Sequence, residues 1–140
     1  MREILFRGKR IDNGELVEGH YHCTDYIWND EEIRRHYILP QNYGDAFVVD
    51  PKTIGQFTGL IDKNGKKIFE GDIVTAKDEI WGSPFCYGIT GKIVYDEASF
   101  FIEPKDVMET QYLFNECAVY EIIGNIHDTP ELLGGMGYGV

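Results

Sequence analysis

Two asparagine–glycine dipeptides constrain the fold of this chain more than any other feature. Asn13-Gly14 and Asn64-Gly65 each lie between stretches of extended-type sequence. Asn-Gly favours the two positive φ values of a tight type I′ turn, so each dipeptide predicts a β-hairpin. The second hairpin is expected to join a strand at 57–61 to one at 67–70 through the turn at 62–65. The chain is therefore expected to be built mainly of strands.

Further strands are expected between short turns. They are predicted at 72–76, 91–95, 99–103 and 120–126, the last of them with a bulge at Gly124. Short strands with a turn about every ten residues favour a small barrel or sandwich. The expected fold class is mostly β, with one or more small barrel-like β domains and one or two short helices. The segments Gly71–Val74 and Gly91–Tyr95 also resemble strands of SH3-like barrels, which implies SH3-like β domains.

Helix signals are few. Asn29 or Asp30 could cap a short helix over 31–35, with acidic residues in its first turn. The segment 128–133 resembles a capped single turn with Pro130 at its first helical position.

The two turn regions also resemble each other. Residues 11–19 and 61–71 share Ile-Asp, Asn-Gly and a closing Glu-Gly. Either both are ordinary hairpins with the same turn chemistry, or they mark a duplicated half. With 140 residues, the chain is expected to form one domain over 1–133, or two small lobes at about 1–50 and 51–133, followed by a flexible glycine-rich tail at 134–140.

The charge of the chain is strongly acidic and unevenly distributed. The net charge is −11, and residues 71–140 carry three basic and twelve acidic groups. This half repels nucleic acid, so a nucleic-acid partner is not expected. An acidic mimic of nucleic acid is one alternative function, carried by these carboxylates: Asp96, Glu97, Glu103, Asp106, Glu109, Glu116 and Glu121. The other interpretation is an ordinary solvated face.

Cysteine usage and hydropathy point to the cytoplasm. Cys23, Cys86 and Cys117 are an odd number and have no C-x-x-C spacing, so they predict reduced, mostly buried thiols instead of a disulfide framework or zinc site. No run of about 18 apolar residues is present, so no membrane segment is expected.

Two side-chain pairs are candidates for chemistry. On a strand, His20 and His22 would point to one face and could seat a metal if a third ligand arrived from elsewhere. Glu70 and Asp72 flank Gly71 and could act as an acid and base, or could accept hydrogen bonds from the turn backbone. Cys86 and His127 have no spacing that fixes a catalytic pair. No residue is assigned as catalytic, cofactor-binding or metal-binding, no cofactor is expected, and the role of each pair stays open.

Aromatic residues cluster near two arginines in the first half of the chain. Such a mixture could stack on bases, but aromatic residues in a small β-protein are expected mainly in the core. The residues are Tyr26, Trp28, Tyr37 and Tyr43, near Arg34 and Arg35.

The central stretch of the chain resembles the signature of the YopX family, a group of small proteins encoded by phages and prophages. The similar segments are 50–60, 62–66 and 68–74, together with Met1–Ile4, Phe6-Arg7, 91–95, 123–126 and 130–133. The resemblance implies a β-rich fold with a small barrel-like part and an origin in a bacterial cytoplasm. It supplies no reaction, ligand or catalytic residue.

The sequence therefore predicts a phage or prophage accessory protein that acts by binding a host or phage macromolecule, most simply a protein. An enzyme that uses a metal or carboxylates on a small molecule or nucleotide is the alternative, although catalysis is the weaker expectation. Self-association is also expected, since small β-domains often pair through sheet edges.

Overall fold

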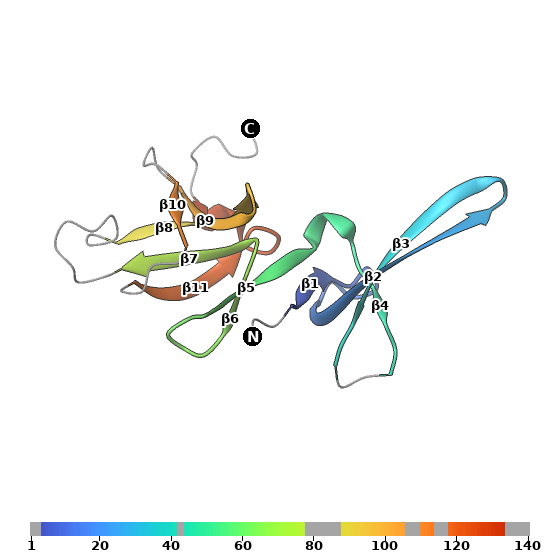
Figure 1. Ribbon diagram of the computed structural model, residues 1–140, viewed down its shortest axis with the longest axis horizontal. Helices are drawn as coiled ribbons and strands as arrows, with labels where there is room; N and C mark the ends of the chain where they lie inside the picture. The colour runs from blue at the N-terminus through green and yellow to red at the C-terminus, as the bar shows by residue number, and fades with distance from the viewer. Residues whose placement is uncertain (1–3, 42–43, 78–87, 106–109, 114–117, 134–140) are drawn as a thin grey trace. The chain divides into compact units, whose positions relative to one another are not determined.

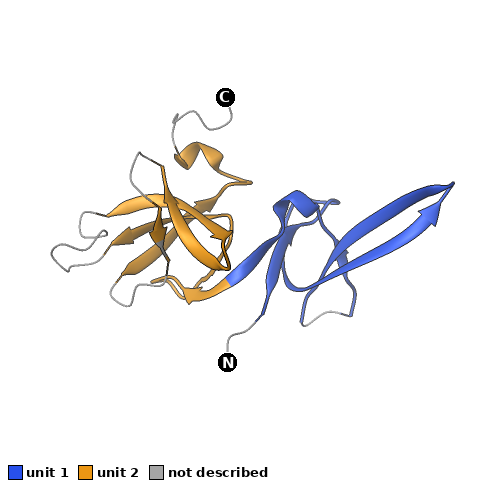
Figure 2. Ribbon diagram, turned by 45° about the horizontal axis from the view of Figure 1, so that its top comes forward, with its two compact units in different colours: residues 1–57 blue, residues 58–140 orange. Residues whose placement is uncertain are grey.

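The computed structural model describes residues 4–41, 44–77, 88–105, 110–113 and 118–133. The chain divides into two compact units, unit 1 (Met1–Phe57) and unit 2 (Thr58–Val140), each of which is described by itself (Figure 2). The predicted tail at 134–140 lies outside the described residues, as do residues 78–87.

Strands dominate the described part of the chain, and the only helices there are two short 3₁₀ turns (Figure 1). The elements are β1 (Phe6–Lys9), β2 (Leu16–Trp28), β3 (Glu31–Leu39), β4 (Phe47–Val48), η1 (Pro51–Thr53), β5 (Gly55–Ile61), β6 (Lys67–Phe69), β7 (Asp72–Lys77), β8 (Ile89–Asp96), β9 (Ser99–Pro104), β10 (Gln111–Tyr112), β11 (Val119–Asn125) and η2 (Pro130–Leu133).

The strands form two antiparallel sheets. One has the order β4-β3-β2-β1-β5-β6 and the other has the order β10-β9-β8-β7-β11. The mostly β fold with one or two short helical pieces is confirmed. The expected closure into a barrel is not seen in the residues that the structure describes, because β10 and β11 end the second sheet without pairing with each other.

In unit 1, Asn13-Gly14 reverses the chain between β1 and β2, as predicted. The register runs from Phe6 opposite Gly19 to Lys9 opposite Leu16. Gly14 has φ +74°, whereas Asn13 is not among the residues with positive φ. The Gly14 N–H donates to the Arg10 carbonyl at 2.9 Å, so the loop is longer than a two-residue type I′ turn.

In unit 2, β7, β8 and β9 enclose the main apolar core. The buried side chains alternate along β8 and β9, as a sheet with one buried face requires. The core consists of Ile68, Val74, Ala76, Ile89, Ile93, Phe100, Ile102, Leu113 and Tyr120.

The second predicted hairpin, between β5 and β6, also forms in unit 2. The Gly65 N–H donates to the Asp62 carbonyl, and Gly65 has φ +82°. The Asp62 carboxylate accepts from the backbone N–H groups of Asn64 and Lys66, both at 2.9 Å. The buried aspartate therefore organises the turn together with the Asn-Gly dipeptide.

The prediction of a short helix over 31–35 is wrong, because these residues form the first part of β3. Asn29 and Asp30 have φ values of 51° and 63°, and Trp28 lies opposite Glu31. Positive φ at both central residues is a type I′ hairpin turn. The two residues expected to cap a helix thus form the tight turn between two long strands.

Two smaller predictions near the end of the described chain are confirmed. The register between β7 and β11 shifts between Ile122 and Gly124, which places the bulge where the glycine predicted it. Residues Pro130–Leu133 form the single helical turn η2. Among the described residues, no helix is both long enough and apolar enough to cross a membrane.

Candidate functional site

The hairpin of β2 and β3 extends beyond the strands that flank it in unit 1 (Figure 1). β1 pairs with β2 only up to Gly19, and β4 pairs with β3 only at Tyr37 and Ile38. In the described part of the chain, residues 24–28 and 31–35 therefore pair with each other alone. Residues 20–36 are called the arm. The arm is a two-stranded ribbon, and most of its side chains are exposed on both of its faces.

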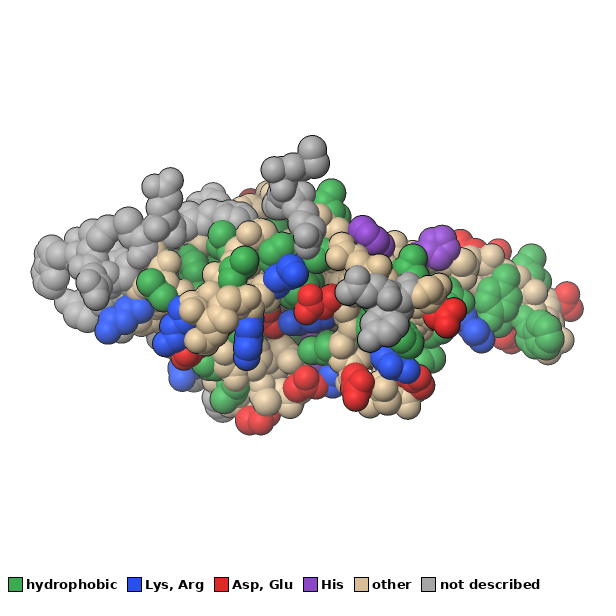
Figure 3. Space-filling view, turned by 90° about the horizontal axis from the view of Figure 1, so that it is seen from below, with side chains coloured by type: hydrophobic (Ala, Val, Ile, Leu, Met, Phe, Trp, Pro, Cys, Tyr) green, Lys and Arg blue, Asp and Glu red, His purple; other side chains and the backbone are tan. Residues whose placement is uncertain are grey.

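Large apolar side chains are exposed at the free end of the arm. Ile27 is 72% exposed and Trp28 is 65% exposed. In Figure 3, apolar side chains (green) gather toward this end, at the right of the view, next to acidic and basic groups. The expectation that the aromatic residues lie in the core is wrong for Trp28, while Tyr26 and Tyr37 are half-buried. Tyr43 lies outside the described residues.

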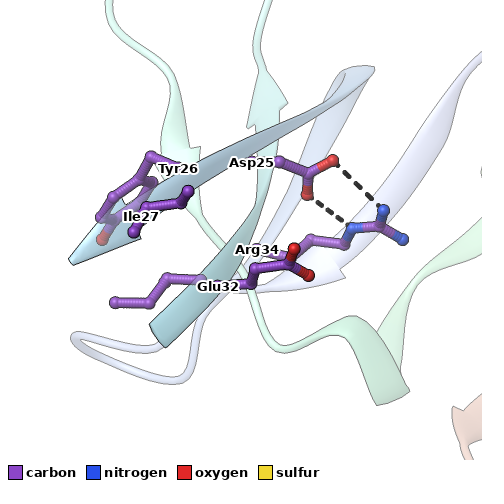
Figure 4. A pocket seen from close by; sticks show the side chains of 6 residues that line it. Asp25, Tyr26, Ile27, Glu32 and Arg34 are labelled. Carbon is purple, nitrogen blue, oxygen red and sulfur yellow. Dashed lines mark hydrogen bonds and ion pairs between the residues drawn. The ribbon is translucent and has the colours of Figure 1, made fainter. Parts of the chain in front are cut away.

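One face of the arm carries an ion pair between its two strands. The Arg34 guanidinium donates to the Asp25 carboxylate through Nε at 2.7 Å and through a terminal nitrogen at 3.2 Å (Figure 4). These hydrogen bonds hold the pKa of Asp25 below its usual value and raise the pKa of Arg34. The pair is exposed, so it fixes the pairing of the two strands more than it stabilises the fold.

The same part of the arm borders an open hollow of about 450 Å³, lined by Asp25, Tyr26, Ile27, Glu32, Ile33 and Arg34 (Figure 4). The lining mixes apolar side chains with two acidic groups and one basic group. A hollow of this kind, open at the surface of a ribbon, suits an inserted side chain of a protein partner better than an enclosed small molecule.

The other face of the arm carries an aromatic and basic group. The Arg35 guanidinium lies over the Tyr26 ring, 5.5 Å from its centroid. These two residues, with Trp28 and Ile33, line a second hollow of about 340 Å³. The structure thus brings together, on the surface, part of the aromatic and arginine group that the sequence singled out.

The base of the arm is fixed by stacked rings. The Tyr21 hydroxyl lies 2.5 Å from His36 Nδ1, and the two rings stack with centroids 5.8 Å apart. Tyr21 also contacts Phe6 of β1. Burial, and then the neighbouring Cys23 thiol, raises the pKa of Tyr21. Cys23 is a free thiol, as predicted, but it is half-buried instead of fully buried. Cys86 and Cys117 lie outside the described residues.

His20 and His22 lie on one face of β2, as strand alternation predicts, and both are exposed. They are opposite Leu39 and Tyr37, and the His22 ring lies 6.3 Å from the Tyr37 ring. The described residues contain no group of three His, Cys, Asp or Glu side chains that could hold a metal ion.

Asp72 has a structural role in the turn before β7. Its side chain is buried, and its carboxylate accepts from the backbone N–H of Phe69 at 2.8 Å. Glu70 lies half-buried in the same turn. His127 follows β11 in unit 2, where its backbone N–H donates to the Asn125 side chain. Cys86, for which no sequence spacing establishes a pairing with His127, lies outside the described residues.

The acidic residues of the second half are spread over several elements in the described part. Asp96 and Glu97 are exposed at the turn between β8 and β9. Glu103 lies 4.0 Å from Lys92, and Glu121 lies 3.0 Å from Lys63. Asp106, Glu109 and Glu116 lie outside the described residues.

Sequence reasoning missed the arm, because the predicted helix at 31–35 concealed its second strand. The signal that could have revealed it is the β-branched and aromatic residues of 20–28, followed after Asn29-Asp30 by Ile33, Tyr37 and Ile38. Ile27 and Glu31 were consequently not recognised as surface residues of one ribbon.

Comparisons with known proteins bear on the family of this chain. A family model described as YopX protein matches residues 5–134. A crystal structure of protein EF1440 from Enterococcus faecalis is similar at 27% sequence identity, over 95% of this chain and 99% of that chain, with a TM-score of 0.49. No curated protein matches. Because the family model covers nearly all of the sequence, the chain belongs to the YopX family.

Proposed function

We propose that this protein is a phage- or prophage-encoded accessory protein that acts in the bacterial cytoplasm by binding another protein through the arm. The single observation that carries the proposal is the exposure of Ile27 and Trp28 at the end of a ribbon that no other strand of the described residues covers. Membership of the YopX family supports the phage origin.

The energetics of the arm favour a covering partner. A two-stranded hairpin that packs on nothing is only marginally stable in water. Fully burying a large apolar side chain contributes about 1.5–3 kcal/mol. Ile27 and Trp28 gain little of this in the arm, because each is more than half exposed. Successive strand residues point to opposite faces, so a partner that encloses the end of the arm on both faces would gain both contributions and would stabilise the ribbon.

The composition of the arm resembles that of a protein interface. Tryptophan, tyrosine and arginine are the residues that most often carry binding energy at interfaces. Trp28, Tyr26 and Arg35 lie on one face of the arm and border a common hollow. Acidic and basic residues surround them, which is the polar rim that a desolvated contact requires.

Affinity capture from a lysate of the native cell tests the proposal. Tagged wild-type protein is expected to retain a specific partner, and a variant with Ile27→Ser and Trp28→Ser is expected to lose it. The matched control carries Ile61→Ser and Val119→Ser, which also replace exposed apolar residues but lie outside the arm. Losing the anchor side chains should weaken binding by about 2 kcal/mol or more, roughly thirtyfold.

Two results would count against this function. One is repeated capture of nothing except the protein itself. The other is retention of the same partner by the arm variant and the control variant alike.

A further inference from the structure

We infer that the open edge of β3 pairs with β3 of a second copy of this chain, antiparallel and about a twofold axis at Ile33. The inference concerns self-association and goes beyond the proposed function, since a partner at Ile27 and Trp28 is not needed for it. It rests on the strand edge, on the direction of the main-chain groups and on the order of charges along β3.

The edge of β3 opposite β2 is unpaired over residues 31–35 in the described part of the chain. β4 covers this edge only at Tyr37 and Ile38. The last main-chain contact along it is the Val49 N–H, which donates to the His36 carbonyl at 2.9 Å. An edge of this kind is a template for another strand.

The same contact fixes which residues present their main-chain groups to the open edge. In a strand, the N–H and C=O of alternate residues point to opposite sides. Because the His36 carbonyl points toward β4, the main-chain groups of Arg34 and Glu32 point to that side too. Those of Ile33 point toward β2, where Ile33 lies opposite Tyr26.

The side chains along this edge are complementary to themselves. Residues 31–35 read Glu-Glu-Ile-Arg-Arg. In an antiparallel pair centred on Ile33, Glu31 lies opposite Arg35 of the second copy, and Glu32 lies opposite Arg34 of the second copy. The twofold axis repeats both pairs, so four opposite-charge pairs flank a central Ile33–Ile33 contact. Opposite charges in cross-strand positions stabilise a sheet, and like charges destabilise it.

The main-chain geometry agrees with this centre. Glu32 and Arg34 would form hydrogen-bonded pairs across the axis, since their N–H and C=O groups face the open side. The central Ile33 pair would be a non-hydrogen-bonded pair, in which side chains come closest. The outcome is four main-chain hydrogen bonds and a continuous four-stranded ribbon.

Contacts within the arm extend into the second copy. Arg34 donates to Asp25 within one chain, so pairing would place its guanidinium between Asp25 and Glu32 of the second copy. On the other face, Tyr26 and Ile33 of the two copies would form an apolar row across all four strands. Charged residues on a sheet edge commonly prevent pairing with another strand, because they face like charges or no charge on that strand. On the β3 edge each charged residue would face an opposite charge.

Sedimentation equilibrium across the micromolar to millimolar range tests the inference on the full chain. Wild type is expected to show a reversible monomer–dimer equilibrium that weakens with added salt, because exposed charge pairs are screened. Glu31→Arg and Arg35→Glu each make two of the four pairs repulsive and should each weaken association about tenfold or more. Glu15→Arg changes the net charge as Glu31→Arg does, but lies outside the arm, and should leave association unchanged.

Mixing the two weakened variants is the decisive part of the experiment. Glu31→Arg leaves arginine at both positions 31 and 35, whereas Arg35→Glu leaves glutamate at both, so the two altered edges complement each other. A one-to-one mixture should therefore form a heterodimer with about the wild-type affinity, which no folding defect could produce. The inference is overturned if wild type stays monomeric throughout the range, if Glu31→Arg associates like wild type, or if the mixture does not recover the dimer. Each of these results leaves the proposed binding of another protein at Trp28 untouched.

Discussion

The Asp62 carboxylate accepts a hydrogen bond from the backbone N–H of Ile122 at 3.1 Å, and so joins the β5–β6 turn to β11 across 60 residues of sequence. Asn64 and Lys66 donate to the other oxygen of the same carboxylate. Asp62 is only 5% exposed. Burial acts to raise its pKa, but the N–H donors of Ile122, Lys66 and Asn64 outweigh burial and lower the pKa below its usual value.

The first prediction concerns stability in acid. Because the pKa of Asp62 is lower in the folded chain than in the unfolded chain, the native state favours the ionised carboxylate. Its contribution is complete above the unfolded pKa of about 3.9 and is lost as the pH falls through the lower folded value. Urea denaturation between neutral pH and pH of about 3 should show the free energy of unfolding decreasing over that range.

The variant Asp62→Asn removes the charge and one acceptor oxygen. It should destabilise the fold by about 1–3 kcal/mol at neutral pH and flatten the acid dependence, because a buried N–H loses its acceptor. Asp45→Asn, at an exposed position, is the control and should change stability by less than about 0.5 kcal/mol. An Asp62→Asn variant with the full acid dependence of wild type would contradict the assignment.

A second prediction concerns the turn between β8 and β9. Glu97 and Ala98 have φ values of 47° and 62°, and Asp96 lies opposite Ser99, so the turn is of type I′. A left-handed conformation is costly for alanine because its Cβ approaches the carbonyl oxygen. Ala98→Gly should therefore stabilise the fold by about 0.5–1 kcal/mol in chemical denaturation.

Ala46→Gly is the matched control for this substitution, since Ala46 is exposed and is not among the residues with positive φ. It should destabilise the fold by about 0.4–1 kcal/mol, because glycine only adds freedom to the unfolded chain there. Equal effects of the two substitutions would show that the strain at Ala98 is absent.

The third prediction concerns the close approach of β8 and β9 at Gly91. A Cβ at this position would lie 2.8 Å from the carbonyl carbon of Glu103 and 2.9 Å from Ile102 Cγ2. Backbone atoms cannot move aside without shifting the sheet, so Gly91→Ala should cost about 2–3 kcal/mol. Thermal unfolding measures the loss. Gly44→Ala meets no atom within 4 Å and should unfold like wild type, and a similarly unchanged Gly91→Ala would rule out the predicted overlap.

Local sequence located the turns of this chain better than it predicted their types. Asn13-Gly14 and Asn64-Gly65 both reverse the chain, yet only the glycine of each pair has positive φ. The type I′ turns form at Asn29-Asp30 and Glu97-Ala98 instead. Turn type depends on how many residues the paired strands leave between them, and strand register is set by partners far away in sequence.

The strand at 31–35 could not be predicted from these residues alone. Glutamate and arginine are good helix formers, and Asn29 and Asp30 are good caps, so local propensity favoured a helix. The nine-residue pairing with β2, which includes the Asp25–Arg34 ion pair, overrides that preference. Core strands such as β8, with alternating burial, were predicted correctly because the alternation itself is local.

The candidate site was the least predictable part. Trp28 was expected in the core because most large aromatic residues are buried, and its sequence neighbours do not indicate that flanking strands end before it. His20 and His22 share a face, as expected, but the positions of other residues on that face depend on the register of β3. The arm is exposed because β1 stops pairing with β2, and β4 with β3, before the end of the hairpin. No local sequence pattern indicates where that pairing stops.

The measurement that tests the role of the arm most directly is photo-crosslinking inside the native cell. A photoreactive amino acid replaces Trp28 in one variant and Ile61 in another, and the two positions are 65% and 58% exposed. The proposed role predicts a discrete crosslinked product with another protein from position 28 and only background from position 61. Equal crosslinking from the two positions, or none from position 28, would contradict the arm as the binding surface.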